Sequence, residues 1–185
     1  MIEIVFEAHA TTHDNENKVA SGWYDVQLSE KGRQQAKELG ERYKNKKFDS
    51  VFCSDLGRSL QTAAIAFGGD PLYADPNLIF VDWRLRECNY GDFTGKPSEF
   101  IETERLHRIT TPFPNGESYQ DTADKMWSFL GDLKDRWDGK KVLLIGHRAT
   151  HYALEHWLND VPLEEAVTQK FVWQPGWEYQ LNHNT

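Results

Sequence analysis

The chain has 185 residues, of which 39% are hydrophobic and 27% are charged, a composition typical of one soluble globular domain. Its 29 acidic and 21 basic side chains give a net charge of −8, which argues against a nucleic acid or an anionic membrane as the main partner. The charge does not exclude a small anionic substrate, because a few arginines can create a positive pocket inside an acidic protein.

The cysteines and the apolar segments indicate a protein of the cytoplasm. Cys53 and Cys88 are too few for a disulfide framework and lack the spacing of metal ligands, so they suit a reducing compartment. Glu3 and Glu7 interrupt the first apolar run, and no apolar stretch is long enough to cross a bilayer. We therefore expect no signal peptide, no membrane-spanning segment and a single domain over residues 1–185.

The chain starts with a predicted strand and a predicted helix. The β-branched apolar run that begins at Ile2 predicts a buried strand, which breaks into small and polar residues around His9. Ser29 can cap a helix that ends at about Tyr43, where lysines follow at its negative end. A strand that ends in a polar loop presents its last side chains where open α/β folds bind ligands, so His9 is a candidate for chemistry.

The same alternation follows in the next part of the chain. Residues 48–53 form a short apolar run that predicts a second strand, and Ser54 and Asp55 then occupy the position of a helix cap. The next helix is expected over residues 60–67, ended by the glycines at 68–69. This strand–helix–strand–helix order predicts a sheet covered by helices on both faces.

The middle of the chain is expected to hold a small cap. Residues 70–96 are irregular in pattern, with several prolines and glycines, and residues 99–107 could form a short helix. We expect the segment 88–116 to form the cap and to set substrate choice. Its aromatic and imidazole side chains include Phe93, Phe100, His107 and Phe113. Arg84 and Arg86, just before the cap, are expected to be solvated or paired with neighbouring carboxylates.

The last third of the chain shows the clearest periodicity. Ser118 opens a long helix with an apolar period close to 3.6, which places Trp127 and Trp137 in the core, and Gly139 stops it. Residues 141–145 are the clearest buried strand, and residues 149–158 form the next helix.

The tail alternates aromatic and polar side chains. Over residues 169–181 this alternation predicts an edge hairpin, turned at Pro175 and Gly176. An aromatic strand at the edge of a sheet would suit the interface of a homodimer. We see no internal repeat, no low-complexity tract and no linker, in agreement with one domain.

Polar residues follow three of the predicted strands. His9 follows the first strand, residues 54–58 the second, and His147 with Arg148 the third. Because parallel strands bring their carboxyl ends together, these residues are expected to share a pocket. Arginine offers a planar fork of donors to phosphate oxygens, and a neutral imidazole can attack phosphorus. An acid must also protonate the leaving oxygen, and Glu87 is the preferred candidate.

Six motifs follow one another in a characteristic order. They are His9 with Thr12 and Asn15; Gly22 with residues 25–32 and 35–36; residues 54–58 with 61–63; residues 85–87 with 90–95; residues 116–118; and residues 142–147. In this order they resemble the motifs of the histidine phosphatase superfamily, the phosphoglycerate mutase-like group with the Arg-His-Gly signature. The resemblance extends from the first strand to about Leu158.

The resemblance implies a three-layer α/β/α sandwich with a mostly parallel sheet, and a phosphomonoester hydrolase that uses a phosphohistidine intermediate. His9 would attack the phosphate, while Arg58 and His147 would stabilise charge on its oxygens. Glu87 would be the general acid and later the base for water. The implied substrate-binding residues are Asn15 and Thr12. The substrate would be a small phosphorylated metabolite, with no metal and no organic cofactor.

The chain departs from the family at its signature. Ala8-His9-Ala10 replaces Arg-His-Gly, so one phosphate-binding arginine is missing. An unreplaced charge-assisted contact would cost roughly 2–5 kcal/mol, on the order of a thousandfold in rate. Arg148 follows the second histidine where the family has glycine, and our hypothesis is that it supplies the missing charge from the opposite strand. The alternative is a solvated arginine on the first turn of a helix.

Three other functions stay open. His147 and His151 are four residues apart, as metal ligands on a helix would be, and so are His9 and His13. The missing arginine would suit a relative that binds a phosphorylated ligand or a protein partner without turnover. A mutase must keep water from its intermediate, which calls for more inserted sequence than the segment 88–116 provides.

Overall fold

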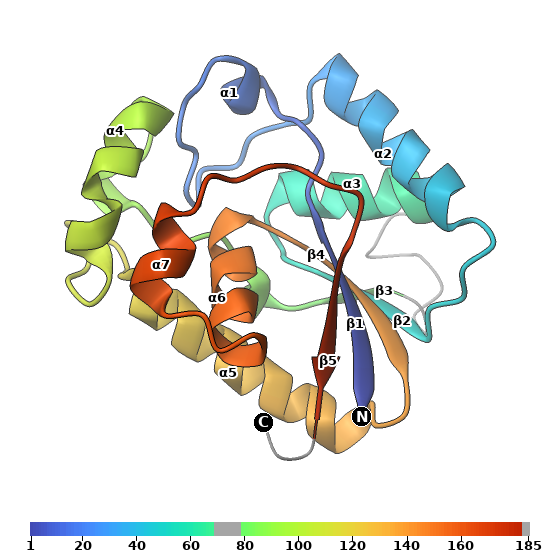
Figure 1. Ribbon diagram of the computed structural model, residues 1–185. Helices are drawn as coiled ribbons and strands as arrows, with labels where there is room; N and C mark the ends of the chain where they lie inside the picture. Colours follow the sequence, from blue (N-terminus) through green and yellow to red (C-terminus); the bar gives the residue numbers. More distant parts are fainter. Residues whose placement is uncertain (69–78, 183–185) are drawn as a thin grey trace.

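A five-stranded sheet lies at the centre of the part of the chain that the structure, a computed structural model, describes: residues 1–68 and 79–182 (Figure 1). The strands are β1 (Ile2–Ala8), β2 (Ser50–Cys53), β3 (Ile79–Val81), β4 (Lys141–Gly146) and β5 (Trp177–Leu181). Their order is β3-β2-β4-β1-β5, and every neighbouring pair is parallel except β1 and β5. The predicted mostly parallel sheet is confirmed.

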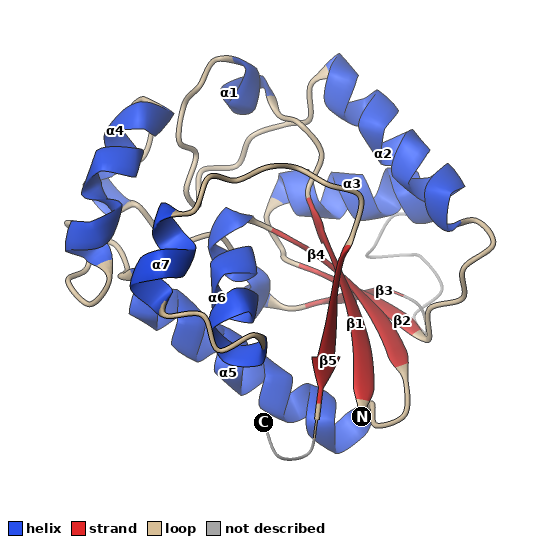
Figure 2. Ribbon diagram, in the orientation of Figure 1, coloured by secondary structure: helices blue, strands red, loops and turns tan. Residues whose placement is uncertain are grey.

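Helices cover both faces of this sheet (Figure 2). The helices are α1 (His13–Glu16), α2 (Glu30–Tyr43), α3 (Gly57–Phe67), α4 (Ser98–Glu104), α5 (Tyr119–Arg136), α6 (Arg148–Leu158) and α7 (Leu163–Thr168). Alternate side chains of β1 enter different cores: Phe6 packs with the residues of α5 and α6, and Val5 with those of α2 and α3. The predicted three-layer α/β/α sandwich is confirmed.

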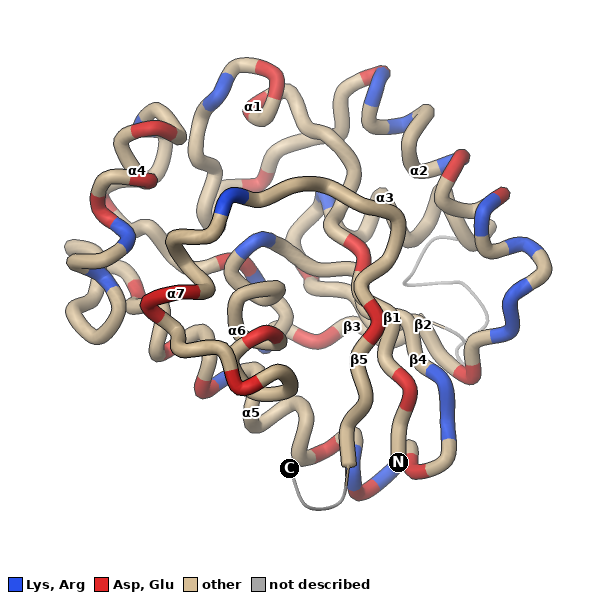
Figure 3. The backbone as a smooth tube through the Cα atoms, in the orientation of Figure 1, with Lys and Arg blue, Asp and Glu red and all other residues tan. Residues whose placement is uncertain are grey.

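Side-chain caps and charges fix the helix ends as the sequence suggests. Ser29 Oγ accepts from the Gly32 N–H at the start of α2, and Ser118 forms a capping box with Asp121 at the start of α5. Basic residues follow the end of α2 and acidic residues begin α7, as the helix dipole favours (Figure 3). The ends of α2 and the start of α5 agree with the predicted boundaries, whereas α7 lies in a stretch where no helix was expected.

The start of α3 differs from the prediction. Its cap residue is Leu56, which makes no side-chain capping bond, so the cap assigned to Ser54 and Asp55 is wrong. The reason is that both side chains have other partners. Ser54 Oγ contacts His147 Nε2 at 2.7 Å, and the Asp55 carboxylate pairs with Arg86. Ser54 and Asp55 therefore connect the loop after β2 to His147 and to Arg86 instead of capping α3.

Three further expectations fail because they depend on distant neighbours. Strand β3 falls in a segment expected to be irregular, and its three residues are defined by pairing with β2; residues 69–78 of that segment and the glycine at 69 lie outside the described residues. The tail is not a hairpin, because only β5 is a strand and its partner is β1. Trp127 is 42% exposed and stacks on Trp157 rather than entering the core.

The described residues contain no helix that is both long enough and apolar enough to cross a membrane. The most apolar segment is β4, whose residues 142–146 are all buried within the sheet. This strand lies between β1 and β2, where helices cover both faces. Its hydrophobicity is therefore explained by the core of the fold.

The close approach of α2 to α3 gives a test of the packing. A Cβ atom on Gly40 would lie 2.3 Å from the Ala66 carbonyl oxygen, so Gly40→Ala should lower the free energy of unfolding by about 1–3 kcal/mol. Gly131 of α5 is the matched control, since a Cβ atom there meets nothing within 4 Å. Gly131→Ala should be neutral or stabilise by up to about 1 kcal/mol in urea unfolding. Equal stability of the two variants would contradict this packing.

Candidate active site

The candidate site lies at the carboxyl ends of β1, β2 and β4. The register of β1 with β4 ends at Ala8 opposite Gly146, and the His9 N–H donates to the Gly146 carbonyl at 2.9 Å. The next residues, His9 and His147, therefore lie side by side, with ring centroids 5.0 Å apart. They line a cavity of about 480 Å³ together with Glu87 and Arg148. This is the edge where parallel sheets bind ligands.

The ring of His9 is oriented by two contacts. Its Nδ1 lies 2.8 Å from the Ala10 carbonyl oxygen, which can only accept, so Nδ1 carries the proton. Nε2 then has a free electron pair and accepts from Arg58 Nε at 3.3 Å. Burial, and then the charge of Arg58, lower the pKa of His9 to about 3. The imidazole is therefore neutral at ordinary pH, the form that acts as a nucleophile.

Arg58 is held in place by backbone carbonyls. It is the second residue of α3 and only 2% exposed. Its Nη1 donates to the Tyr24 carbonyl at 3.2 Å and its Nη2 to the Gly22 carbonyl at 2.7 Å. Gly22 has a positive φ of 49°, which favours glycine at this point of the loop. The loop that resembles the second family motif thus orients the guanidinium toward His9.

His147 is completely buried beside His9. Its Nε2 lies 2.7 Å from Ser54 Oγ, and its backbone N–H donates to Thr150 Oγ1. Burial is the main cause that lowers the pKa of His147 well below its usual value, and the charges of Arg58 and His9 add to it. A second neutral imidazole therefore lies at the end of the neighbouring strand.

Glu87 is anchored at the first turn of α6. Its Oε1 accepts from the backbone N–H groups of Cys88 and Ala149, and its Oε2 accepts from that of Arg148. The N–H groups of Arg148 and Ala149 begin α6 and have no partner within that helix, so the Glu87 carboxyl group satisfies them. Glu87 is 7% exposed and borders the same cavity as His9. The acid expected from sequence and the two histidines thus share one cavity.

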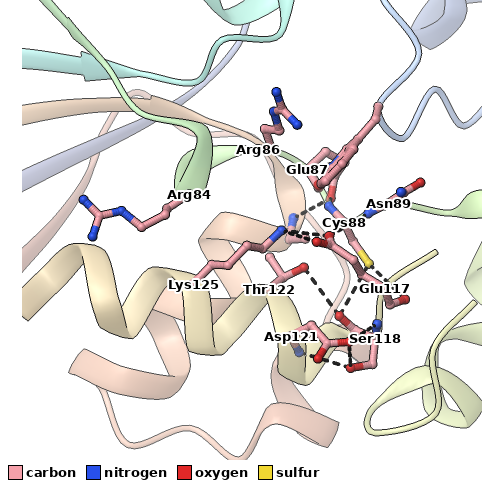
Figure 4. A network of polar contacts seen from close by, with 12 residues as sticks. Arg84, Arg86, Glu87, Cys88, Asn89, Glu117, Ser118, Asp121, Thr122 and Lys125 are labelled. Carbon is pink, nitrogen blue, oxygen red and sulfur yellow. Dashed lines mark hydrogen bonds and ion pairs between the residues drawn. The ribbon is translucent and has the colours of Figure 1, made fainter.

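A polar network fixes the loop that carries Glu87 (Figure 4). The Glu117 carboxylate accepts from the Asn89 N–H at 3.1 Å and forms an ion pair with Lys125 of α5 at 2.7 Å. The Cys88 thiol contacts the carbonyls of Glu117 and Ser118. Because α5 packs on α6, this network ties the loop to the helix that holds the Glu87 carboxylate.

The predicted substrate-binding residues differ in their surroundings. Thr12 is fully buried, and its Oγ1 accepts from the Asn15 N–H in a capping box at the start of α1. Asn15 borders the cavity. Arg148 also borders it, but its Nη1 donates to Glu102 Oε1 at 3.1 Å and its guanidinium packs over the ring of Phe171. The site roles of these residues stay predictions.

Other sequence candidates lie away from the cavity. Arg84 pairs with Asp82 and Asp132, and Arg86 pairs with Asp55. Phe113 is 1% exposed and contacts the rings of Tyr90, Phe93 and Tyr119, so it builds the cap rather than facing a substrate. Among residues 1–68 and 79–182, no group of three or more His, Cys, Asp or Glu side chains could hold a metal ion.

Several cavity residues were not recognised from the sequence. Those from α2 are Gln35, Glu38, Leu39 and Arg42, and those before β5 are Phe171 and Trp173. The spacing of the α2 residues places them on one helix face, which could have marked them. Arg105 of the cap borders a smaller adjoining recess of about 100 Å³ that also includes His9 and Arg58. The segment before β5 carried no such signal, because its position depends on the β1–β5 pairing.

The tautomer and charge of His9 can be measured directly. Long-range ¹H–¹⁵N NMR should show a neutral ring protonated at Nδ1 from pH 8 down to about pH 4, since the pKa of His9 is lowered to about 3. His9→Ala identifies the resonance. Below the ordinary histidine pKa the unfolded chain binds a proton that the folded chain does not, so stability should fall as the pH drops from about 6.5. A titration midpoint near 6.5 would contradict this environment.

Comparisons with known sequences agree with this geometry. The chain matches the histidine phosphatase superfamily (branch 1) over residues 4–172. A 2,3-bisphosphoglycerate-dependent phosphoglycerate mutase of Streptococcus gordonii is 31% identical over 146 residues, which are 71% of this chain and 62% of that protein. Phosphoglycerate mutase 1 of Saccharomyces cerevisiae is 41% identical over 99 residues, 52% of this chain and 39% of that protein. The chain thus spans about half the length of these curated relatives.

Solved structures give the same result. Bacillus stearothermophilus YhfR aligns with a TM-score of 0.85 and 25% identity, over 100% of this chain and 94% of that one. A mycobacterial glucosyl-3-phosphoglycerate phosphatase in complex with VO3 aligns with a TM-score of 0.75 and 25% identity, over 91% of this chain and 87% of that one. The family match covers most of this chain, and YhfR shares its fold over the full length. The chain therefore belongs to the histidine phosphatase superfamily and has the phosphoglycerate mutase-like fold of that family.

Proposed function

We propose that the protein is a phosphomonoester hydrolase that acts on a small phosphorylated metabolite through a phosphohistidine. The observation that carries the proposal is the orientation of His9. Its Nδ1 proton is held by the Ala10 carbonyl, and its Nε2 electron pair faces the Arg58 guanidinium. Phosphate oxygens attracted by Arg58 would bring phosphorus close to this electron pair, which is the geometry that nucleophilic attack requires.

In the first step, His9 Nε2 forms a bond to phosphorus and the bond from phosphorus to the ester oxygen breaks. Glu87, entering this step protonated, gives its proton to the leaving oxygen, so an alcohol departs. Arg58 and His147 donate to the equatorial oxygens, where negative charge is spread in the transition state. A His147 donor requires the proton to lie on the nitrogen that faces the phosphate.

In the second step, water attacks the phosphohistidine. The Glu87 carboxylate takes a proton from the water as its oxygen bonds to phosphorus, and the electron pair of the breaking P–N bond returns to His9 Nε2. Inorganic phosphate leaves and Glu87 is again protonated. The residues of this cycle border two adjoining spaces: His9, Glu87 and His147 line the larger cavity, and Arg58 lines the recess that also includes His9 and Glu87.

Ala8 supports a second candidate, a relative that binds a phosphorylated ligand without turnover, because the arginine of the family signature is missing. A mutase is a further alternative, because the curated relatives are phosphoglycerate mutases. Against it, the segment 88–116 forms only a short cap of one α-helix and 3₁₀ turns, whereas a mutase must keep water away from its intermediate. Hydrolysis is favoured over simple binding because His9, Arg58, Glu87 and His147 are all present together at the site.

The nucleophile is tested by removing it. His9→Ala should lower hydrolysis of 4-nitrophenyl phosphate near pH 6 by roughly a thousandfold or more, and acid-labile phosphate should no longer be trapped on the protein. His13→Ala is the matched control, because His13 is exposed at the start of α1. Equal activity of the two variants would rule out His9 as nucleophile. No activity in the unmodified protein, with phosphate or vanadate still bound, would favour the binding candidate.

The role of Arg148 is tested separately. If it replaces the signature arginine, Arg148→Ala should lower kcat/KM by at least about 30-fold, since truncating one partner of a buried charged contact costs roughly 2 kcal/mol or more. Arg33→Ala is the control, an arginine removed from the exposed face of α2. If Arg148→Ala loses no more activity than Arg33→Ala, the arginine does not compensate for Ala8.

A further inference from the structure

The cavity that contains His9 continues away from the cap. Beyond the catalytic residues it runs between one face of α2 and the chain before β5. In Figure 1 this stretch crosses above the upper ends of the central strands on its way from α7 to β5. A bound phosphate group would fill the part of the cavity at His9, but it does not explain the part between α2 and the chain before β5, which we call the extension. At about 480 Å³ the whole cavity is large enough for a small organic ligand.

Ala8 lies between the two parts of the cavity. It is the last residue of β1, it is half-buried, and it borders the cavity as do its chain neighbours Glu7 and His9. An arginine at this position would add a long side chain to the same space. The departure from the family signature therefore has a steric consequence besides the lost charge, because the short methyl group leaves room next to the nucleophile.

Two aromatic residues before β5 contribute to the extension in different ways. Phe171 stacks on Trp177 and carries the Arg148 guanidinium on its ring, so it anchors the chain. Trp173 is 55% exposed, and Arg42, 5.7 Å from its ring centroid, is the contact that the structure gives for this ring. A large flat apolar surface thus stands half open at the cavity, which is typical of a binding surface rather than of a core residue.

The charges of the extension do not favour a second anion. Arg42 is already neutralised, since its Nη2 pairs with Glu7 Oε1 at 3.0 Å, and Tyr43 donates to the same oxygen at 2.6 Å. Glu38 adds a further carboxylate to the lining. Two acids against one base make this end neutral to negative, in contrast to the phosphate end with Arg58 and Arg148.

From these observations we infer that the extension is a subsite for the leaving group, and that it takes an uncharged aromatic ring stacked on Trp173. The substrate class is then a phosphate monoester whose leaving alcohol carries an aryl or heteroaryl ring, with the phosphate at His9 and the ring against Trp173. This inference rests on the proposed function for the phosphate end. Trp173 is the specificity-determining residue, and Leu39 is an apolar residue of the same lining.

Non-hydrolysable ligands test the subsite without any need for turnover. Phenylphosphonate and methylphosphonate present the same anionic group and differ in the ring, and calorimetry gives both dissociation constants. The unmodified protein should bind phenylphosphonate about tenfold more tightly or better. Trp173→Ala should remove this preference while affinity for methylphosphonate stays unchanged, and Trp173→Phe should retain most of it. Trp83→Ala is the matched control, since Trp83 is 54% exposed but lies outside the cavity.

The outcomes separate the two proposals. Equal affinity for the two phosphonates in the unmodified protein, or a preference that survives Trp173→Ala, would overturn the subsite while leaving the phosphate end intact. A preference lost equally in Trp83→Ala would show an effect on the whole fold and would also overturn the assignment to Trp173. If neither phosphonate binds, the proposed phosphate site fails and the subsite fails with it.

Discussion

The parallel pairing of β1 with β4 is the constraint on which the rest of the site depends. It brings together two segments more than 130 residues apart in the sequence and ends both strands at the same level, Ala8 opposite Gly146. The backbone pairing therefore places the histidines that follow the two strands side by side. Helix α6 begins at this edge and gives Glu87 its backbone partners, so the acid is positioned by the same pairing.

Backbone groups do most of the orienting in this site. Carbonyls of residues 10, 22 and 24 set the proton on His9 and the direction of Arg58, and amides of residues 88, 148 and 149 hold Glu87. Backbone groups cannot change rotamer, so little conformational entropy is lost when a ligand arrives. Such a site is pre-organised by its fold, which suits a reaction whose catalysis consists mainly of placement and charge.

The parts of the protein that could be predicted are those with a local signal. Strand β4 contains a continuous apolar run, and β1 is a β-branched apolar run interrupted by Glu3 and Glu7. Ser29 and Ser118 cap their helices, and the order of strands and helices placed His9 and His147 at one edge. The missed parts depend on partners far away in the chain. Strand β3 is defined by its pairing with β2, and strand β5 by its pairing with β1. Trp173 reaches the cavity only because the chain before β5 returns to the edge of the sheet that carries His9 and His147.

The hydrogen bond from Arg58 Nε to His9 Nε2 has a chemical consequence for the reactivity of the imidazole. The electron pair that would form the new bond is engaged by a guanidinium until an anion competes for that guanidinium. An oxyanion that draws the N–H toward itself would release the electron pair at the moment a suitable electrophile is present. The imidazole bound to Arg58 is thus protected from uncharged alkylating or acylating reagents. In the proposed reaction, the arginine that binds the anion would also determine when His9 Nε2 is free to attack.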